Sequence, residues 1–163
     1  MKVVVADTGP IIALAKLDRL DLLLSIFAAV LVPDVVFEEC LYDHAKPETR
    51  AIEAAFANGI LTLKSMDEVP KLPETGWLDD GEATAIALAK MIACPVLVDE
   101  KRGRTVAKKA GLQVIGTCGL LVQAKRTGAI QAVMPLLDEL DGVGYFLSQE
   151  LRQETFRLCD ELP

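Results

Sequence analysis

The stretch that most constrains this chain runs from Leu78 to Arg104, because it joins a buried helix to a buried strand and has acids at the start of the helix and at the end of the strand. Residues 79–82 open the helix with three acids, and residues 83–93 form the alanine-rich apolar run of a largely buried helix. Pro95 ends that helix, and the triplet 96–98 predicts a short strand that stops at Asp99. In an open α/β sheet, ligands bind beyond the carboxyl ends of the strands, so Asp99 is predicted to lie at a functional edge.

The rest of the chain repeats this alternation of short apolar strands and helices. It predicts an α/β fold: a single three-layer domain with a mostly parallel central sheet and helices on both faces. The predicted strands are residues 2–6, 30–32, 60–63, 96–98 and 113–115. The apolar spacing predicts two short helices or one bent helix over residues 11–28, and a basic helix over residues 105–110. Residues 65–77, with two prolines and a glycine, predict a long surface loop.

Composition excludes several classes of protein. With 163 residues, 52% of them apolar, the chain can bury one core of ordinary size. It has no apolar run long enough to span a membrane, and its N-terminus lacks the cleavage region of a signal peptide, so we expect a cytoplasmic protein. Its four cysteines are scattered and His44 is its single histidine, which argues against a zinc site.

The net charge of −7 argues against a generic basic nucleic-acid-binding protein, but the charge is unevenly placed. Residues 101–126 hold seven lysines and arginines and no acid, whereas the rest of the chain has ten bases against 24 acids. A cationic segment directly after the acidic helix and strand would draw a polyanion toward the acids. The alternative for this segment is a solvated helix face without a partner.

Four acidic positions are candidates for a site at this edge: Asp7, Glu39, Glu82 and Asp99. Three of them also have a structural explanation. Asp7 fits a helix cap, Glu82 fits a capping box with Asp79, and Glu39 or its neighbour Glu38 fits a solvated helix surface. Asp99 is harder to explain in that way, because a carboxylate directly after a buried strand must be paired, hydrated or bound to a cation.

Other families that place an acid after a strand do not fit. Asp7-Thr8-Gly9 matches the tripeptide of aspartic proteases, but those proteins are all-β and need paired motifs. A phosphatase of the haloacid-dehalogenase type needs a second acid at position 9, which is glycine. The chain has neither a phosphate-binding GxxxxGK[ST] loop nor a GxGxxG turn. Carboxylates without His or Cys favour Mg²⁺ or Mn²⁺ and, with them, phosphate substrates.

Five stretches, in order along the chain, resemble the PIN-domain family, whose members are metal-dependent ribonucleases and include the toxins of many prokaryotic toxin–antitoxin pairs. The stretches are DTGPIIALAKL, VPDVVFEE, DDGEATAIALA, VDEKRGR and VIGTCGLLVQAKRTG. The resemblance covers residue 2 to about residue 147. It implies a PIN-like nuclease domain over residues 1–147, with residues 148–163 as a C-terminal helix packed on that domain or extending it.

The resemblance also implies a role for each matching residue. The four acids of the family fall on the four candidates named above, with Glu38 as the alternative to Glu39 and Glu100 as an additional ligand candidate. Asp7, Glu82 and Asp99 would bind the metal, although many members have Asp where Glu82 stands. Thr8 matches a hydroxyl residue that would bind a carboxylate or a metal-bound water. The bases that would hold the RNA backbone are Lys101, Arg102 and Arg104.

The implied function is a Mg²⁺- or Mn²⁺-dependent endoribonuclease that leaves 5′-phosphate and 3′-hydroxyl ends, with an antitoxin protein as a partner. A homodimer is expected from the same resemblance and from the apolar residues 11–27 and 133–137, which exceed what one sheet layer needs. Two alternatives stay open. One is a PIN module that binds RNA or protein without cutting, and the other is a different Mg²⁺-dependent phosphotransfer enzyme or nucleotide hydrolase.

Overall fold

The computed structural model describes residues 2–67, 72 and 75–161, so part of the predicted loop 65–77 lies outside the described residues. The strands are β1 (Lys2–Ala6), β2 (Phe27–Pro33), β3 (Thr62–Lys64), β4 (Val96–Leu97) and β5 (Val114–Ile115). The helices are α1 (Thr8–Lys16), α2 (Leu22–Ile26), α3 (Asp34–Cys40), α4 (Pro47–Ala57), α5 (Asp80–Ile92), α6 (Lys101–Lys109), α7 (Thr117–Arg126), α8 (Met134–Gly142) and α9 (Gln149–Leu158). No helix in these ranges combines the length and apolarity that a membrane span requires.

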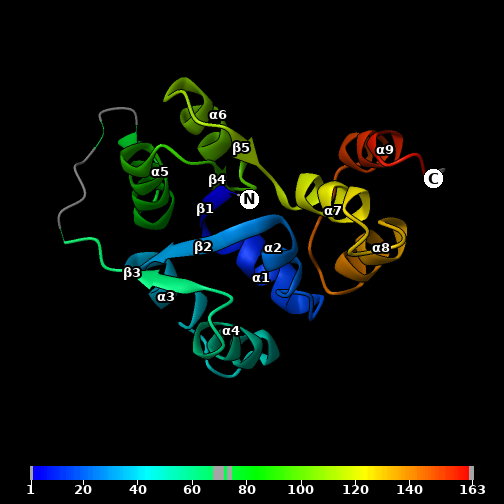
Figure 1. Ribbon diagram of the computed structural model, residues 1–163, viewed down its shortest axis with the longest axis horizontal. Coiled ribbons are helices and arrows are strands. Elements are labelled where there is room, and N and C mark those ends of the chain that lie inside the picture. Colours follow the sequence, from blue (N-terminus) through cyan, green and yellow to red (C-terminus); the bar gives the residue numbers. More distant parts are fainter. Residues whose placement is uncertain (1, 68–71, 73–74, 162–163) are drawn as a thin grey trace.

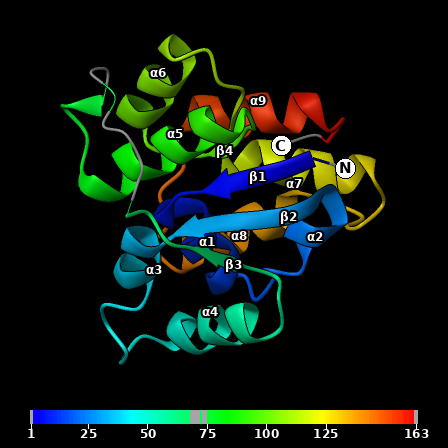
Figure 2. The same cartoon turned by 60° about the vertical axis from the view of Figure 1, so that its left-hand side comes forward.

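In the described part of the chain, the strands form one five-stranded sheet in the order β3-β2-β1-β4-β5. Every pair of neighbouring strands is parallel, and the arrows of β1, β2 and β3 in Figure 2 run the same way. Figure 1 shows α5 and α6 on one side of the sheet and α1, α2 and α7 on the other. The predicted α/β architecture is confirmed.

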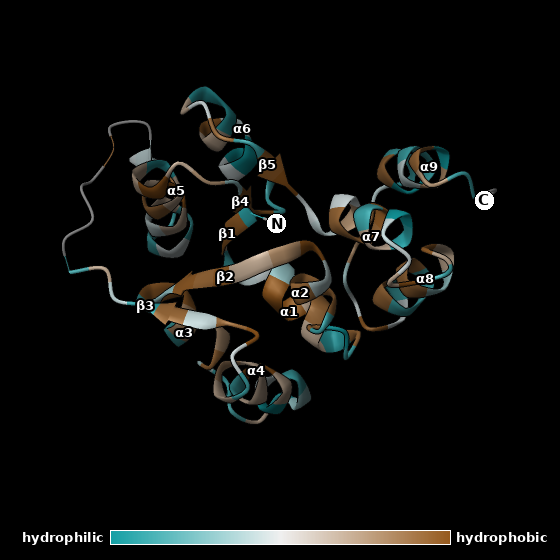
Figure 3. Cartoon of the chain, viewed as in Figure 1, coloured by the Kyte–Doolittle hydropathy of each residue, from teal (hydrophilic) through white to brown (hydrophobic). Residues whose placement is uncertain are grey.

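Two apolar clusters cover the two faces of the sheet. Successive side chains of a strand point to opposite faces, and in β1 Val4 and Ala6 belong to the larger cluster while Val5 belongs to the smaller one. The larger cluster also takes its members from α1, α7, α8 and α9, and the smaller one from α5 and α6. In Figure 3, brown predominates in β1 and β2 at the centre, and teal is concentrated on the surrounding helices such as α6 and α9.

Two of the predicted boundaries were wrong. Residues 11–28 do contain two helices, but Phe27 and Ala28 belong to β2, where Phe27 pairs with Lys2 of β1. Pairing of this end of β2 with β1 overrides the helical spacing of these apolar residues. The basic helix predicted to start at Thr105 begins four residues earlier, because the amide of Arg104 already donates to the carbonyl of Glu100 at 2.9 Å.

The apolar segments that predicted a homodimer lie mostly in the core of this chain. Ile11 and Leu14 are 1% exposed, and Val133 and Leu137 are fully buried. These side chains therefore do not provide a free apolar surface. The homodimer stays a prediction that depends on the family resemblance.

Glu161 ties the end of the chain to two helices. Its carboxylate accepts hydrogen bonds from the backbone amides of Val133 at 2.7 Å and Met134 at 3.0 Å, at the start of α8. It also accepts one from the ammonium group of Lys125 in α7, at 3.1 Å. Burial raises the pKa of Glu161, but these hydrogen bonds outweigh burial and lower the pKa to about 2. Phe156 of α9 is in the larger cluster, so α9 is fixed both by the core and by this carboxylate.

Replacing Glu161 by Gln should lower the free energy of unfolding by about 2 kcal/mol near neutral pH, because the amide cannot replace these charge-assisted hydrogen bonds. The folded pKa lies below the unfolded value of 4.5, so wild-type stability should fall as the pH drops from 4.5 toward 2. The variant should lack this part of the decline. Urea unfolding across that range measures both effects. The exposed Glu154→Gln is the control, and equal losses in the two variants would contradict the role of Glu161.

Candidate functional site

The segments that follow β1 and β4 touch each other at the carboxyl edge of the sheet. The two strands are neighbours, and the amide of Asp7 donates to the carbonyl of Leu97 at 2.9 Å. A Cβ atom placed on Gly9 would lie 3.7 Å from both the Cβ and Oδ2 of Asp99. The topology therefore brings Asp7 and Asp99 to the same edge, as expected for residues that follow adjacent parallel strands.

Glu39 reaches this edge from α3. Its Oε2 accepts a hydrogen bond from the hydroxyl of Thr8 at 2.8 Å. Its carboxylate also lies against the first turn of α5, where a Cβ atom on Gly81 would be only 2.5 Å from Oε1 of Glu39. Both of the neighbouring glutamates that the sequence left open are exposed, but Glu39 is the one that makes these contacts.

Glu82 enters the site from the first turn of α5 and is 6% exposed. Its backbone amide donates to Oδ1 of Asp79 at 2.8 Å, which is half of the expected capping box. Its carboxylate lies against α6, where a Cβ atom on Gly103 would be 2.7 Å from Oε2 of Glu82. The glycines of the stretches DDGEA and EKRGR thus leave room for the carboxylates of Glu39 and Glu82.

Two of these carboxylates are buried with an incomplete set of partners. Asp7, like Glu82, is 6% exposed. Oδ1 of Asp7 and Oε2 of Glu82 have no hydrogen-bond partner among the described residues. Burial is the largest cause that raises the pKa of Asp7 to about 7, and the charges of Asp79, Glu39 and Asp99 raise it further. Such oxygens are strong candidates for cation ligands, because a buried carboxylate needs a partner for its charge.

Burial likewise raises the pKa of Glu82 to about 8, and Asp79 and Glu100 add to the shift. The pKa of Glu39 is also raised, by burial and then by Asp79. Asp79 is therefore the common neighbour of Asp7, Glu39 and Glu82. The sequence assigned it only the role of a helix cap, and its place among these acids was missed.

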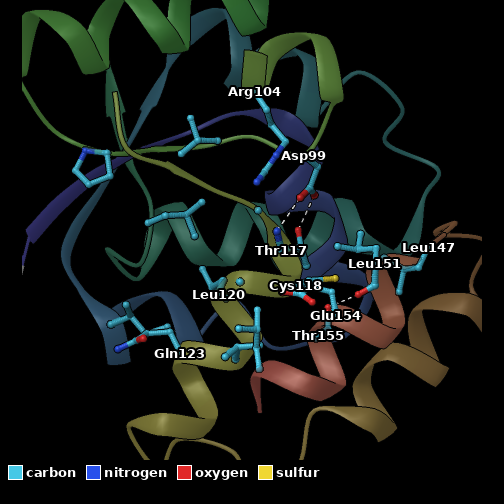
Figure 4. A pocket seen from close by; sticks show the side chains of 18 of the residues that line it. Asp99, Arg104, Thr117, Cys118, Leu120, Gln123, Leu147, Leu151, Glu154 and Thr155 are labelled. Atoms are coloured by element: carbon cyan, nitrogen blue, oxygen red, sulfur yellow. Dashed lines mark hydrogen bonds between the residues drawn. The ribbon is translucent and has the colours of Figure 1, made fainter. Parts of the chain in front are cut away.

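Asp99 differs from the other acids because its carboxylate is well supplied with donors. Its Oδ1 accepts the backbone amide of Thr117 at 2.7 Å, and its Oδ2 accepts the Thr117 hydroxyl at 2.6 Å. The hydroxyl of Tyr145 donates to the same Oδ2. Figure 4 shows Asp99 hydrogen-bonded to Thr117 at the start of α7, with Arg104 extending beside it. The sequence did not predict either partner as a site residue.

A cavity of about 930 Å³ opens beside Asp99. Asp99, Arg104, Thr117 and Tyr145 line it at the carboxyl edge of the sheet, and both apolar and polar side chains line the rest, most of them from β5, α7 and α9. The lining does not include Asp7, Glu39 or Glu82. Asp99 therefore lies between this cavity and the other acids.

The basic residues that follow Asp99 begin α6. The guanidinium of Arg102 donates to the carbonyl of Trp77 at 3.3 Å, and that of Arg104 donates to the carbonyl of Val98 at 3.1 Å. These bonds hold the start of α6 against the segment before α5 and against the end of β4. Lys101 is exposed at the first position of the same helix.

The acids are neighbours without being arranged as a finished metal centre. In the ranges that the structure describes, no three Asp, Glu, His or Cys side chains form a group placed to hold a metal ion. The donor set nevertheless fits a hard divalent cation. Two buried carboxylate oxygens lack partners among the described residues, and neighbouring acids help to raise the pKa of Asp7 and of Glu82, which a bound cation would reverse.

Comparison with known proteins gives one match. A family model described as a PIN domain matches residues 3–161, which extends past the sequence resemblance to include α9. No curated protein and no solved structure matches the chain.

Replacing Gly81 by Ala should push Glu39 away from α5, because the new methyl group would take the place of its carboxylate. An alanine in a helix is ordinarily more stable than a glycine by roughly 0.5–1 kcal/mol. We expect the Gly81→Ala variant to be no more stable than the wild type. The matched control is Gly119→Ala in α7, where the Cβ would lie 3.9 Å from Ile115. Thermal unfolding compares the two, and an equal gain in both would contradict the contact between Gly81 and Glu39.

Metal-free protein should lose stability as the pH rises. The folded pKa values of Asp7 and Glu82 lie above the unfolded values of 3.8 and 4.5, so the folded state holds extra protons between those values and about 8. The melting temperature in a chelator should fall over this range, and Asp7→Asn should reduce the fall. A wild-type melting temperature that rises over the same range would contradict the assigned protonation.

Proposed function

This chain belongs to the PIN-domain family, and on that premise we propose that it is a Mg²⁺- or Mn²⁺-dependent endoribonuclease that hydrolyses RNA phosphodiester bonds. The observation that supports the proposal most is that two buried oxygens at the carboxyl edge of a parallel sheet, Oδ1 of Asp7 and Oε2 of Glu82, have no hydrogen-bond partner among the described residues. Apolar packing explains neither oxygen, whereas a divalent cation would satisfy both.

The residues proposed to hold the cation are Asp7, Glu82 and Asp99, with Glu39 as the fourth acid of the site. A bound Mg²⁺ or Mn²⁺ would lower the pKa of a water and neutralise charge that develops on the phosphate. Thr8 fixes Glu39 through its hydroxyl, at 2.8 Å. Asp79 adds negative charge next to three of these acids, which strengthens the attraction for a cation.

The basic start of α6 is proposed to hold the RNA backbone. Arg102 and Arg104 each donate to a backbone carbonyl, which holds their side chains in place, and Arg104 lies beside Asp99. Lys101 is exposed next to them. Such contacts position a phosphate backbone without reading its sequence. We also propose, from the resemblance of the five sequence stretches alone, that the protein is the toxin of a toxin–antitoxin pair and forms a homodimer.

One observation favours a second candidate, a PIN module that binds RNA or protein without cutting. Three hydrogen bonds already occupy the carboxylate of Asp99, and the acids do not form a ready metal site in the described part of the chain. Protein that binds single-stranded RNA but leaves it intact with Mg²⁺ and with Mn²⁺ would support this candidate and contradict the nuclease.

Replacing Glu82 by Gln tests the nuclease most cleanly, because the amide keeps the shape of the side chain and removes a charge beside Asp79 and Glu100. Without metal, the variant should melt a few degrees above wild type near the pKa of Glu82, because repulsion is relieved. It should also lose the rise in melting temperature that Mn²⁺ causes, and its RNA cleavage should fall about a hundredfold or more.

The exposed Glu38→Gln is the matched control, since it removes the same charge from the residue next to Glu39, which does not make the contacts of Glu39. It should retain both the Mn²⁺-induced rise and the cleavage rate. A Glu82→Gln variant that cleaves RNA at the wild-type rate, at the same Mn²⁺ concentration, would show that Glu82 is not part of the site.

A further inference from the structure

We propose that Tyr145 and Thr117 are positioning residues of the nuclease, whose hydroxyls hold the carboxylate of Asp99 in one orientation at the edge of the acid cluster. The inference rests on the proposed function, in which Asp99 is one of the metal-binding acids. It adds two residues, 18 and 46 positions away from Asp99 in the sequence, that bind this acid directly.

The three hydrogen bonds to Asp99 divide unequally between its two oxygens. Oδ1 accepts only the backbone amide of Thr117, whereas Oδ2 accepts both hydroxyls. A carboxylate has about four lone-pair sites, two on each oxygen, so these bonds use both sites of Oδ2 and one of Oδ1. Asp99 can therefore offer a cation one remaining site, on Oδ1, and its carboxylate cannot rotate without breaking a hydrogen bond.

Capping of α7 does not account for both hydroxyls. To cap the start of α7, Asp99 needs only the amide of Thr117, the first residue of that helix, and this bond is already made through Oδ1. The hydroxyls of Thr117 and Tyr145 converge on the other oxygen, where they satisfy no further helix amide. Their common effect is to fix the direction of the carboxylate, as outer hydrogen-bond partners do for ligands in metal sites.

The chain around Tyr145 is built to bring its hydroxyl to this point. Gly144 has a φ of +85°, which turns the chain after α8, and the amide of Tyr145 then donates to the carbonyl of Leu140 at 2.9 Å. The next side chain, Phe146, is 87% exposed, while Leu147 is buried in the core. Tyr145 is thus held on both sides and turned inward, so the segment between α8 and α9 reaches the acid edge.

The test removes each hydroxyl while keeping the side-chain shape, with Tyr145→Phe and Thr117→Val. Cleavage of a single-stranded RNA is measured as kcat and KM in Mn²⁺, and the Mn²⁺-induced rise in melting temperature is measured separately. Both variants should lose about tenfold or more in kcat, with KM for RNA little changed, and both should show a smaller Mn²⁺-induced rise.

Two further variants separate positioning from stability. Thr117→Ser keeps the hydroxyl and should recover most of the activity that Thr117→Val loses. Tyr42→Phe removes a hydroxyl from a tyrosine that is 87% exposed and should cleave like wild type. Variants that melt earlier but keep wild-type kcat per folded molecule, and a wild-type Mn²⁺-induced rise, would show a merely structural role and overturn the inference.

The same measurements distinguish a failure of the inference from a failure of the proposed function. Wild-type protein that cleaves RNA, alongside a Tyr145→Phe variant that cleaves equally well, contradicts the positioning role alone. Wild-type protein that neither cleaves RNA nor gains melting temperature with Mn²⁺ contradicts the nuclease itself, and the positioning role with it.

Discussion

The burial of carboxylates at one edge of the sheet is the constraint on which the rest of this structure depends. Asp7 and Glu82 are almost inaccessible, and each has an oxygen without a partner among the described residues. A buried carboxylate must either keep a proton or find a positive charge, and the neighbouring Asp79 makes the ionised forms less favourable still. The molecule holds this unfavourable arrangement because helices on both faces fix its backbone. Strain of this kind is found where a ligand compensates for it.

The packing around the acids follows from that constraint. Gly81 and Gly103 lack side chains where the carboxylates of Glu39 and Glu82 lie, so α5 can approach α3 and α6 closely. Asp99 has different surroundings, with three donors to its carboxylate. The site therefore combines two acids that each have one oxygen without a partner among the described residues with a third acid that is held in place. A cation would compensate the first two, and the third has a fixed orientation before any cation arrives.

Much of the fold and of the site could be predicted from local sequence patterns. Short β-branched runs alternate with helices, so a parallel sheet follows, and acids after β1 and β4 must then meet because those strands are adjacent. Phe27 and Ala28 were assigned to a helix because their apolar spacing is equally compatible with a helix and a buried strand. Only pairing with Lys2 and its neighbours on β1 decides between the two.

Other features had no signal in the sequence at all. Tyr145 reaches Asp99 only because the chain turns back after α8, and no spacing rule connects residues 46 positions apart. Nothing in the sequence distinguishes Gly81 of α5 and Gly103 of α6 from other helix residues, because the carboxylates that lie against them come from other helices. The apolar residues 11–27 suggested a free surface because their burial against α3, α4 and α7 was not visible in the sequence.

The central claim is that the unpartnered oxygens of Asp7 and Glu82 belong to a site for a divalent cation. The most direct measurement is the anomalous scattering of Mn²⁺ in a crystal of the wild-type protein soaked with the ion. The account predicts a peak within coordinating distance of at least one of these two oxygens, at the carboxyl edge of β1 and β4. Well-ordered density for Asp7 and Glu82 with no peak beside them, at a Mn²⁺ concentration that supports RNA cleavage, would contradict it.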